Sequence, residues 1–363
     1  MISAQIGRVT GRGLAGNMRR HYPASLLYGL VGLFLVANVI NIGADLGAMA
    51  AALKLLIDAP VVVYIAGFAV ATTLLEVFMR YARYASVLRW LTLSLFAYVG
   101  TVFVVGVPWG VVAENLALPH LSLEGNYLTV VVAVFGTTIS PYLFFWQASE
   151  EVEDEQEDAE AKPLIKAPLQ APRQMARIQL DMLVGMGFSN IIALFIMLTT
   201  AATLNAHGVK DIETSSQAAE ALRPIAGEFA FTIFALGIIG TGLLALPVLA
   251  GSAAYAVGEA LKWRVGLAQR PGRAPAFYGT IAVATLVGAA LNFSPLDPIK
   301  ALFWSAVING VAAVPIMVMN TLMGSRQEVM GQFTLRPLLK TLGWLATAVM
   351  SAAAVGMFAT WGD

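Results

Sequence analysis

The stretch AVFGTTISPYLFFW, residues 133–146, is apolar at both ends and polar in the middle. Pro141 has no backbone N–H to donate, and its ring clashes with the carbonyl of the preceding turn. Gly136 makes the same turn more flexible. The sequence therefore predicts a helix that breaks between two apolar halves. If this segment lies in a membrane, the freed carbonyl groups need partners within the protein or in a water-lined cavity.

The composition indicates that the broken helix does lie in a membrane. The chain has 363 residues, of which 58% are hydrophobic and 12% are charged, whereas a soluble domain has roughly 25% charged residues. It has no cysteine, which excludes disulfides and thiolate metal sites. The zinc-protease, phosphate-loop and dinucleotide motifs are also absent from the sequence. We therefore expect neither an enzyme nor a cofactor-binding protein.

Nine apolar segments are long enough to cross a bilayer, which needs roughly 20 residues per helix. They predict an all-α polytopic membrane protein. Residues 1–23 precede the first segment and lack the apolar core of a signal peptide. The nine predicted spans are 25–57, 60–79, 84–107, 127–148, 178–204, 227–260, 276–294, 299–323 and 338–361.

The basic residues predict the orientation of the chain. Alternate loops, beginning with the N-terminal segment, hold 18 of the 22 lysines and arginines. Because basic loops stay on the cytoplasmic side, this distribution predicts a multi-pass protein of the cell membrane with a cytoplasmic N-terminus. The acidic run Glu150 to Glu160 then lies in a cytoplasmic loop, about 150–177, which we expect to be solvated.

Asp45 is a carboxylate in the middle of the first predicted span. Asn41 lies four residues earlier, so that both side chains share one helix face. Asp45 is either a buried polar group that bonds to a neighbouring helix or part of a proton or ion relay with Asn41. Ionisable groups are costly at membrane depth and usually serve a function there, which favours the relay.

Hydroxyl and amide groups accompany the predicted break. Thr137, Thr138 and Ser140 place hydroxyls beside the freed carbonyls, as in transporters that bind ions at unwound helix segments. A simple proline kink is the alternative. Asn190 and Asn309 lie within other spans, where each either lines a cavity or bonds two helices together.

Several motifs along the chain resemble those of one protein family, the Nramp divalent-metal transporters, and particularly its branch associated with magnesium. The resemblance runs from the N-terminus to about Trp361. It implies a leucine-transporter-type fold of two inverted repeats, in which the nine spans are family helices three to eleven and residues 1–23 are the end of the second. The motifs are IGRVTGRGLA (6–15), ADLGA (44–48), GTTISPYLFF (136–145), HGVKDIETSSQAAEALRPIAG (207–227) and KWRVGL (262–267).

The resemblance also assigns site residues. The family's broken helix reads Ala-x-x-Met-Pro-His, and its alanine carbonyl and methionine sulfur bind the metal. Here Thr137 and Ser140 take the positions of those two ligands, and Tyr142 that of the histidine. Replacing sulfur by a hydroxyl favours hard cations such as Mg²⁺ or Mn²⁺. Thr138, Tyr142, Asn190 and Asn309 are then expected around the cavity, and the loss of the histidine leaves proton coupling open.

The family's first helix, with its Asp-Pro-Gly-Asn-like motif, has no counterpart in this sequence. Because the chain begins inside a segment that resembles the second helix, we expect a translation start further upstream. The resemblance implies divalent metal transport by alternating access, with metal ions and the lipid bilayer as partners and no nucleic acid. The alternatives are a truncated, non-transporting fragment and an organic-substrate permease of the same fold.

Overall fold

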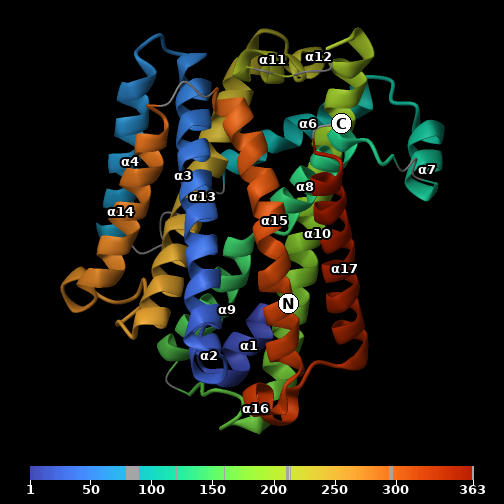
Figure 1. The fold of residues 1–363 in the computed structure, drawn as a ribbon. Helices are drawn as coiled ribbons and strands as arrows, with labels where there is room; N and C mark the ends of the chain where they lie inside the picture. The colour runs from blue at the N-terminus through green and yellow to red at the C-terminus, as the bar shows by residue number, and fades with distance from the viewer. Residues whose placement is uncertain are drawn as a thin grey trace.

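The computed structural model describes residues 1–78, 90–118, 122–158, 160–209, 212, 214–293 and 297–361. These residues form helices and connecting loops, with no strand among them (Figure 1). The longer helices are α3 (Ala24–Lys54), α4 (Val61–Phe78), α8 (Gly125–Thr138), α9 (Pro141–Glu157), α10 (Ala171–Thr203), α13 (Ala230–Leu261), α14 (Pro275–Leu291), α15 (Pro298–Ser325) and α17 (Pro337–Ala359). The shorter ones are α1 (Ile2–Thr10), α2 (Leu14–His21), α6 (Phe96–Val104), α7 (Trp109–Ala117), α11 (Ser215–Glu220), α12 (Arg223–Ala226) and α16 (Gln327–Met330).

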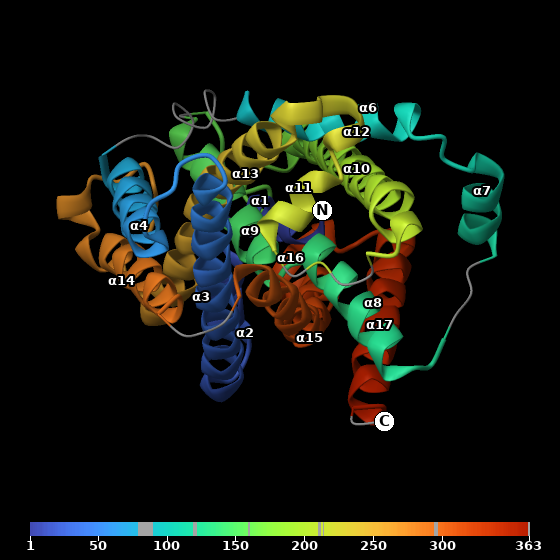
Figure 2. The same cartoon turned by 90° about the horizontal axis from the view of Figure 1, so that it is seen from above.

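Helices α3, α13 and α15 form the centre of the bundle. Helix α3 packs along both α13 and α15, while α4 and α14 lie on one side and α8 and α17 on the other (Figures 1 and 2). Helix α13 can approach its neighbours closely because residues 236–257 are rich in glycine and alanine. Half of the most apolar stretch of α3 and of α13 is buried.

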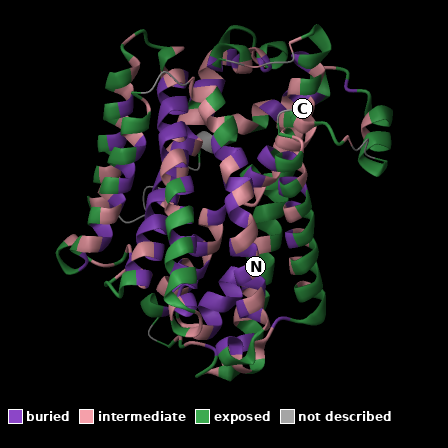
Figure 3. Ribbon diagram, viewed as in Figure 1, coloured by how far each residue is buried: buried purple, intermediate pink, exposed green. Residues whose placement is uncertain are grey.

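The outer helices expose apolar side chains rather than polar ones. In Figure 3 the buried residues gather in the central helices, and α4, α14 and α17 carry exposed faces. Val63 on α4, Leu286 on α14 and Val355 on α17 are each more than half exposed. Such a surface is suited to contact with lipid.

The structure confirms the multi-pass architecture and corrects individual spans. Seven helices in the described residues are long and apolar enough to cross a membrane, and α14 is a shorter apolar helix. The predicted span 84–107 is not one straight helix. Its described part consists of a 3-10 turn, Leu91–Leu95, and α6, after which the chain bends by 109° into α7. Residues 84–89 of that span lie outside the described residues.

The N-terminal segment is packed against the bundle rather than extending from it. Ile6 and Val9 of α1 and Leu14 and Met18 of α2 belong to a buried apolar cluster that includes residues of α9 and α15. The backbone of α1 also accepts hydrogen bonds from the N–H groups of residues 164 and 165 in the loop after α9. The apolar side chains of α1 and α2 are therefore part of the folded core.

The expectation of a solvated acidic loop is wrong for its first half. Helix α9 continues to Glu157, nine residues beyond the predicted end of the span. Glu151 is buried and forms an ion pair with Arg177 on α10, while a carboxylate oxygen of Glu153 accepts a hydrogen bond from the N–H of Leu267. These contacts help to explain why the charged residues remain helical, since the carboxylates of Glu151 and Glu153 each have a specific partner.

Candidate functional site

The predicted break is present between α8 and α9. Helix α8 ends at Thr138, Ile139 has the non-helical angles φ −121° and ψ 60°, and Ser140 is extended. Helix α9 then starts with Pro141, a favoured first residue of a helix. Because Pro141 has no N–H, the carbonyl of Thr137 lacks its usual helical donor. The break therefore leaves this carbonyl with only a long hydrogen bond, 3.4 Å, from the Ser140 hydroxyl, within a single 33-residue candidate span.

The hydroxyl groups at the break are engaged with the backbone of α8. The Ser140 hydroxyl donates to the Gly136 carbonyl at 2.6 Å, and the hydroxyls of Thr137 and Thr138 donate to the Val134 carbonyl at 2.8 and 3.0 Å. Ser140 is buried, whereas the side chain of Thr137 is exposed. In this conformation the hydroxyls close the last turn of α8, while their oxygen lone pairs can still accept a hydrogen bond or bind a cation.

Helix α15 crosses α8 at the break in direct backbone contact. A Cβ atom added at Gly136 would overlap the carbonyl oxygen of Ala306, and one at Gly310 would lie 2.6 Å from the Val132 carbonyl oxygen. Only glycine permits so close an approach. The crossing places Asn309, the residue before Gly310, beside the broken segment.

A buried amide pair connects α15 to α3. The Asn41 side chain donates to the side-chain oxygen of Asn309 at 2.9 Å, and both residues are less than one-tenth exposed. Asn38, one turn earlier on the same face of α3, donates to the carbonyl of Leu249 on α13. In this conformation Asn309 does act as a bond between helices, the alternative left open by the sequence. It does so next to the break.

Asp45 lies one turn beyond Asn41 on α3 and is half-buried. Its carboxylate forms no ion pair within the described residues. It interacts electrostatically with the Tyr142 hydroxyl, in the first turn of α9. Five of the predicted residues therefore come together from α3, α8–α9 and α15: Asn41, Asp45, Ser140, Tyr142 and Asn309.

The donor atoms in this group are oxygens of hydroxyl, amide, carbonyl and carboxylate groups. In the described residues no cluster of three or more His, Cys, Asp or Glu side chains could hold a metal ion. Structural zinc sites are generally built from three or four such side chains, so the donors gathered here are of a different kind. Neutral oxygens with one carboxylate instead suit Mg²⁺, Ca²⁺ or Mn²⁺ that keeps part of its water shell.

Comparison with known proteins identifies the family. The family model described as natural resistance-associated macrophage protein-like, Nramp, matches residues 1–360. This chain belongs to the Nramp family. Divalent metal cation transporters named MntH from Burkholderia ambifaria and Klebsiella pneumoniae (strain 342) are 25% and 22% identical to it. The matches cover 96% of this chain and 75% and 80% of those relatives.

Solved structures show that the Nramp chain has the fold of its family, which is of the leucine-transporter type. A manganese transporter from Eremococcus coleocola, in complex with an aromatic bis-isothiourea compound, superimposes with a TM-score of 0.75 at 15% identity. The superposition covers all of this chain and 78% of that transporter. A mutant of the same transporter gives a TM-score of 0.74 with the same coverage.

The Nramp fold separates Asn190 from the other predicted site residues. Asn190 is exposed on α10, and its side chain donates to the carbonyl of Met186 in the same helix at 2.7 Å. Helix α10 packs mainly against α6 and the adjoining turns, away from the crossing of α8 and α15. The expectation that Asn190 lines the cavity at the break is therefore not met in this conformation, because an amide within one turn of its own helix satisfies its hydrogen bond locally.

Sequence reasoning overlooked two carboxylates of the helical bundle, one buried and one half-buried. Glu76 on α4 is 4% exposed, and neither of its carboxyl oxygens has a hydrogen-bond partner within the described residues. Glu259, near the end of α13, accepts hydrogen bonds from the N–H of Gly16 and from the Ser149 hydroxyl. The signal in the sequence was the isolated acidic residue in each apolar span, the same signal that identified Asp45.

Proposed function

We propose that this chain transports divalent metal cations across a membrane and that the break between α8 and α9 is where the cation binds. The observation that carries the proposal is the meeting of Asn41, Asp45, Asn309 and Tyr142 with an interrupted helix inside an apolar bundle. Membership of the Nramp family and the divalent metal transporters among its relatives support the same function.

The cargo that fits these donors best is a hard cation such as Mg²⁺ or Mn²⁺. The carbonyl of Thr137 and the hydroxyl of Ser140 are the proposed ligands at the break. Thr138, Tyr142 and Asn309 can hydrogen-bond to waters that the cation retains, because Mg²⁺ gives up its water shell reluctantly. Asp45 supplies the negative charge, with Asn41 beside it, and either attracts the cation or carries a proton.

The arrangement of the loops supports a cytoplasmic N-terminus. Arg12, Arg19 and Arg20 share one pocket with Lys262, and Arg326 stacks over the ring of Tyr22. Basic residues from the N-terminal segment and from the loops after α13 and α15 therefore gather at one end of the bundle. The excess of basic residues at this end is the pattern of the cytoplasmic face of a cell-membrane protein. Alternating access would expose the break to each side of the membrane in turn.

The test is ion uptake into liposomes that contain the purified protein, with Mg²⁺, Mn²⁺ and Cd²⁺ compared for the wild type and for Ser140→Met. We expect the wild type to carry Mg²⁺ and Mn²⁺. The substitution introduces a soft sulfur ligand and should raise Cd²⁺ uptake relative to Mg²⁺ by about tenfold, which corresponds to roughly 1.4 kcal/mol of differential binding.

Thr334→Met, in the loop after α16 and away from the break, is the matched control and should leave the ion ranking unchanged. A wild type that carries no divalent cation would overturn the proposed function. A wild type that carries Cd²⁺ and excludes Mg²⁺ would keep metal transport and refute the assignment of a hard-cation site.

A further inference from the structure

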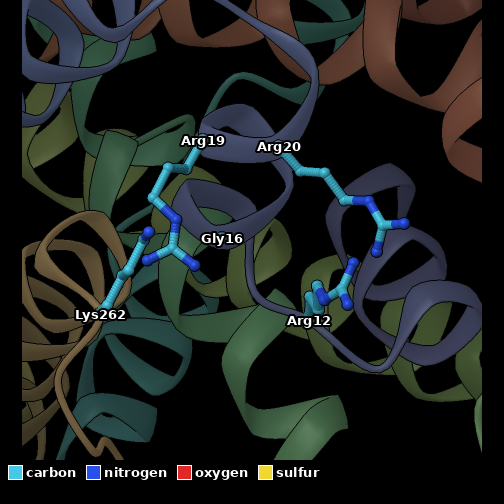
Figure 4. A pocket seen from close by; sticks show the side chains of 5 residues that line it. All are labelled: Arg12, Gly16, Arg19, Arg20 and Lys262. Atoms are coloured by element: carbon cyan, nitrogen blue, oxygen red, sulfur yellow. The ribbon is translucent and has the colours of Figure 1, made fainter.

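A basic pocket lies at the end of the bundle, away from the break in α8–α9. It is lined by Arg12, Gly16, Arg19, Arg20 and Lys262 and has a volume of about 320 Å³ (Figure 4). Four of the five lining residues therefore carry a positive charge. Helix α2 supplies Arg19 and Arg20, and Lys262 caps the C-terminal end of α13.

The four cations are not neutralised by ion pairs. Among the described residues, none of these four side chains forms an ion pair. Arg19 donates to the main-chain carbonyl of Glu259 at 2.7 Å, an acceptor that carries no net charge. Figure 4 shows the side chains of Arg19 and Lys262 converging from opposite sides.

One carboxylate lies behind the pocket and offsets part of this charge. Glu259 bonds to the N–H of Gly16 at 2.8 Å and to the Ser149 hydroxyl at 3.2 Å, and it interacts electrostatically with Arg19. Its oxygens face the backbone of α2, so the N-terminal N–H groups of that helix are already in use. Four cations against one carboxylate leave a net charge of about +3 around the pocket.

Besides burial, the positive charges around the pocket lower the pKa of His21, which follows Arg20 on α2. Burial lowers the pKa of its imidazole, and Arg20, Arg12 and Arg326 lower it further, while Glu328 acts in the opposite direction. Two of those three arginines line the pocket. Like charges held close together are unfavourable unless an anion lies between them.

The pocket lies where the apolar spans end. Arg20 precedes the first residue of α3 by four positions, and Lys262 directly follows the last residue of α13. Trp263 and Tyr28 beside them are exposed, at 40% and 52%. Exposed tryptophan and tyrosine at the ends of spans are typical of the membrane–water boundary, where basic pockets between helices bind lipid head groups.

We propose that the pocket lined by Arg12, Arg19, Arg20 and Lys262 binds a phosphate group. Arginine recognises phosphate oxygens through paired N–H donors, and lysine adds a mobile point charge. The volume accommodates a phosphate with several waters, each of which occupies about 30 Å³ in the liquid. The phosphate belongs either to an anionic lipid head group or to a free phosphate ion, since both present the same oxygens.

The test measures binding of each source to the purified protein in detergent. Native mass spectrometry counts bound phosphatidylglycerol, with phosphatidylcholine as the lipid of zero net charge, and calorimetry measures inorganic phosphate. The variant is Arg20→Gln with Lys262→Asn, because both side chains are exposed and asparagine tolerates the positive φ of 63° at position 262. Arg270→Gln with Arg273→Gln removes two exposed charges from the neighbouring loop and is the matched control.

We expect the pocket variant to bind roughly 30-fold more weakly, and Arg20→Gln alone about fivefold more weakly, while the control changes binding less than twofold. A loss confined to phosphatidylglycerol would assign the pocket to a lipid head group, and a loss confined to inorganic phosphate would assign it to the free ion. The proposal is refuted if the wild type binds neither, or if the pocket variant and the control weaken binding equally. Neither binding measurement depends on metal uptake, so this test is independent of the proposed transport function.

Discussion

At the scale of single residues, the isolated polar side chain in an apolar span was the informative feature of the sequence. It identified Asp45, Asn41 and Asn309, which the structure places together beside the break. Spacing along one helix predicted that Asn41 and Asp45 share a face. It gave no information on their partners from other helices, because contacts between residues 268 positions apart depend on tertiary packing. Asn190 is also an isolated polar residue in an apolar span, but tertiary packing places it away from the break.

The role of Asp45 is tested by Asp45→Asn, which keeps the shape of the side chain and removes its charge. We expect the rate of Mn²⁺ uptake into liposomes to fall at least tenfold, which corresponds to about 1.4 kcal/mol of activation free energy. Membrane abundance should be retained, because Asp45 forms no ion pair among the described residues. Asp58→Asn, at an exposed position beyond the same helix, is the control. Unchanged uptake and pH dependence in Asp45→Asn would remove this carboxylate from the mechanism.

At the scale of helices, composition and helix-breaking residues predicted most spans within a few positions. Pro141 and Gly136 correctly placed the break, because the missing N–H of proline acts locally. The bend after α6 and the continuation of α9 to Glu157 were not predicted. Hydropathy scores a charged segment as loop, whereas Glu151 and Glu153 remain helical because Arg177 and the backbone of Leu267 bond to them.

The contact between α8 and α15 is tested by Gly136→Ala. The added methyl group would overlap the carbonyl oxygen of Ala306, so the two helices must separate. We expect a loss of roughly 1–3 kcal/mol in stability, seen as a lower melting temperature in detergent, together with reduced metal uptake. Gly185→Ala is the matched control, since a Cβ there has no neighbour within 4 Å, and it should be neutral or slightly stabilising. Equal melting temperatures for the two variants would contradict the close crossing.

The helical end of α9 is tested by Glu151→Ala. This change leaves Arg177 without its buried partner, so we expect the stability to fall by about 1–3 kcal/mol. Glu157→Ala, at an exposed position six residues later in the same helix, should stay within about 0.5 kcal/mol of the wild type. Thermal unfolding in detergent compares the two variants. If Glu151→Ala and the wild type have the same melting temperature, the acidic run is a solvated segment after all.

At the scale of the whole molecule, the Nramp family accounts for the fold, and the residues at the break account for the proposed cargo. The family motifs in the sequence predicted the leucine-transporter-type architecture, which the superposition on solved transporters confirms. The basic pocket at the end of the bundle was not predicted, because its arginines lie at least 242 positions from Lys262 and meet it only in the folded chain. Their lack of ion-pair partners among the described residues also depends on tertiary packing, which the sequence alone does not show.

The most direct test of the central claim is the position of bound Mn²⁺ in the protein. Crystals soaked in Mn²⁺ would give an anomalous difference peak at the metal. We predict a peak between α8 and α9, about 2.0–2.6 Å from the Thr137 carbonyl oxygen or the Ser140 hydroxyl oxygen, or one water away from them. An ordered peak more than one helical turn, about 5.4 Å, from both atoms in a protein that still transports Mn²⁺ would contradict the account.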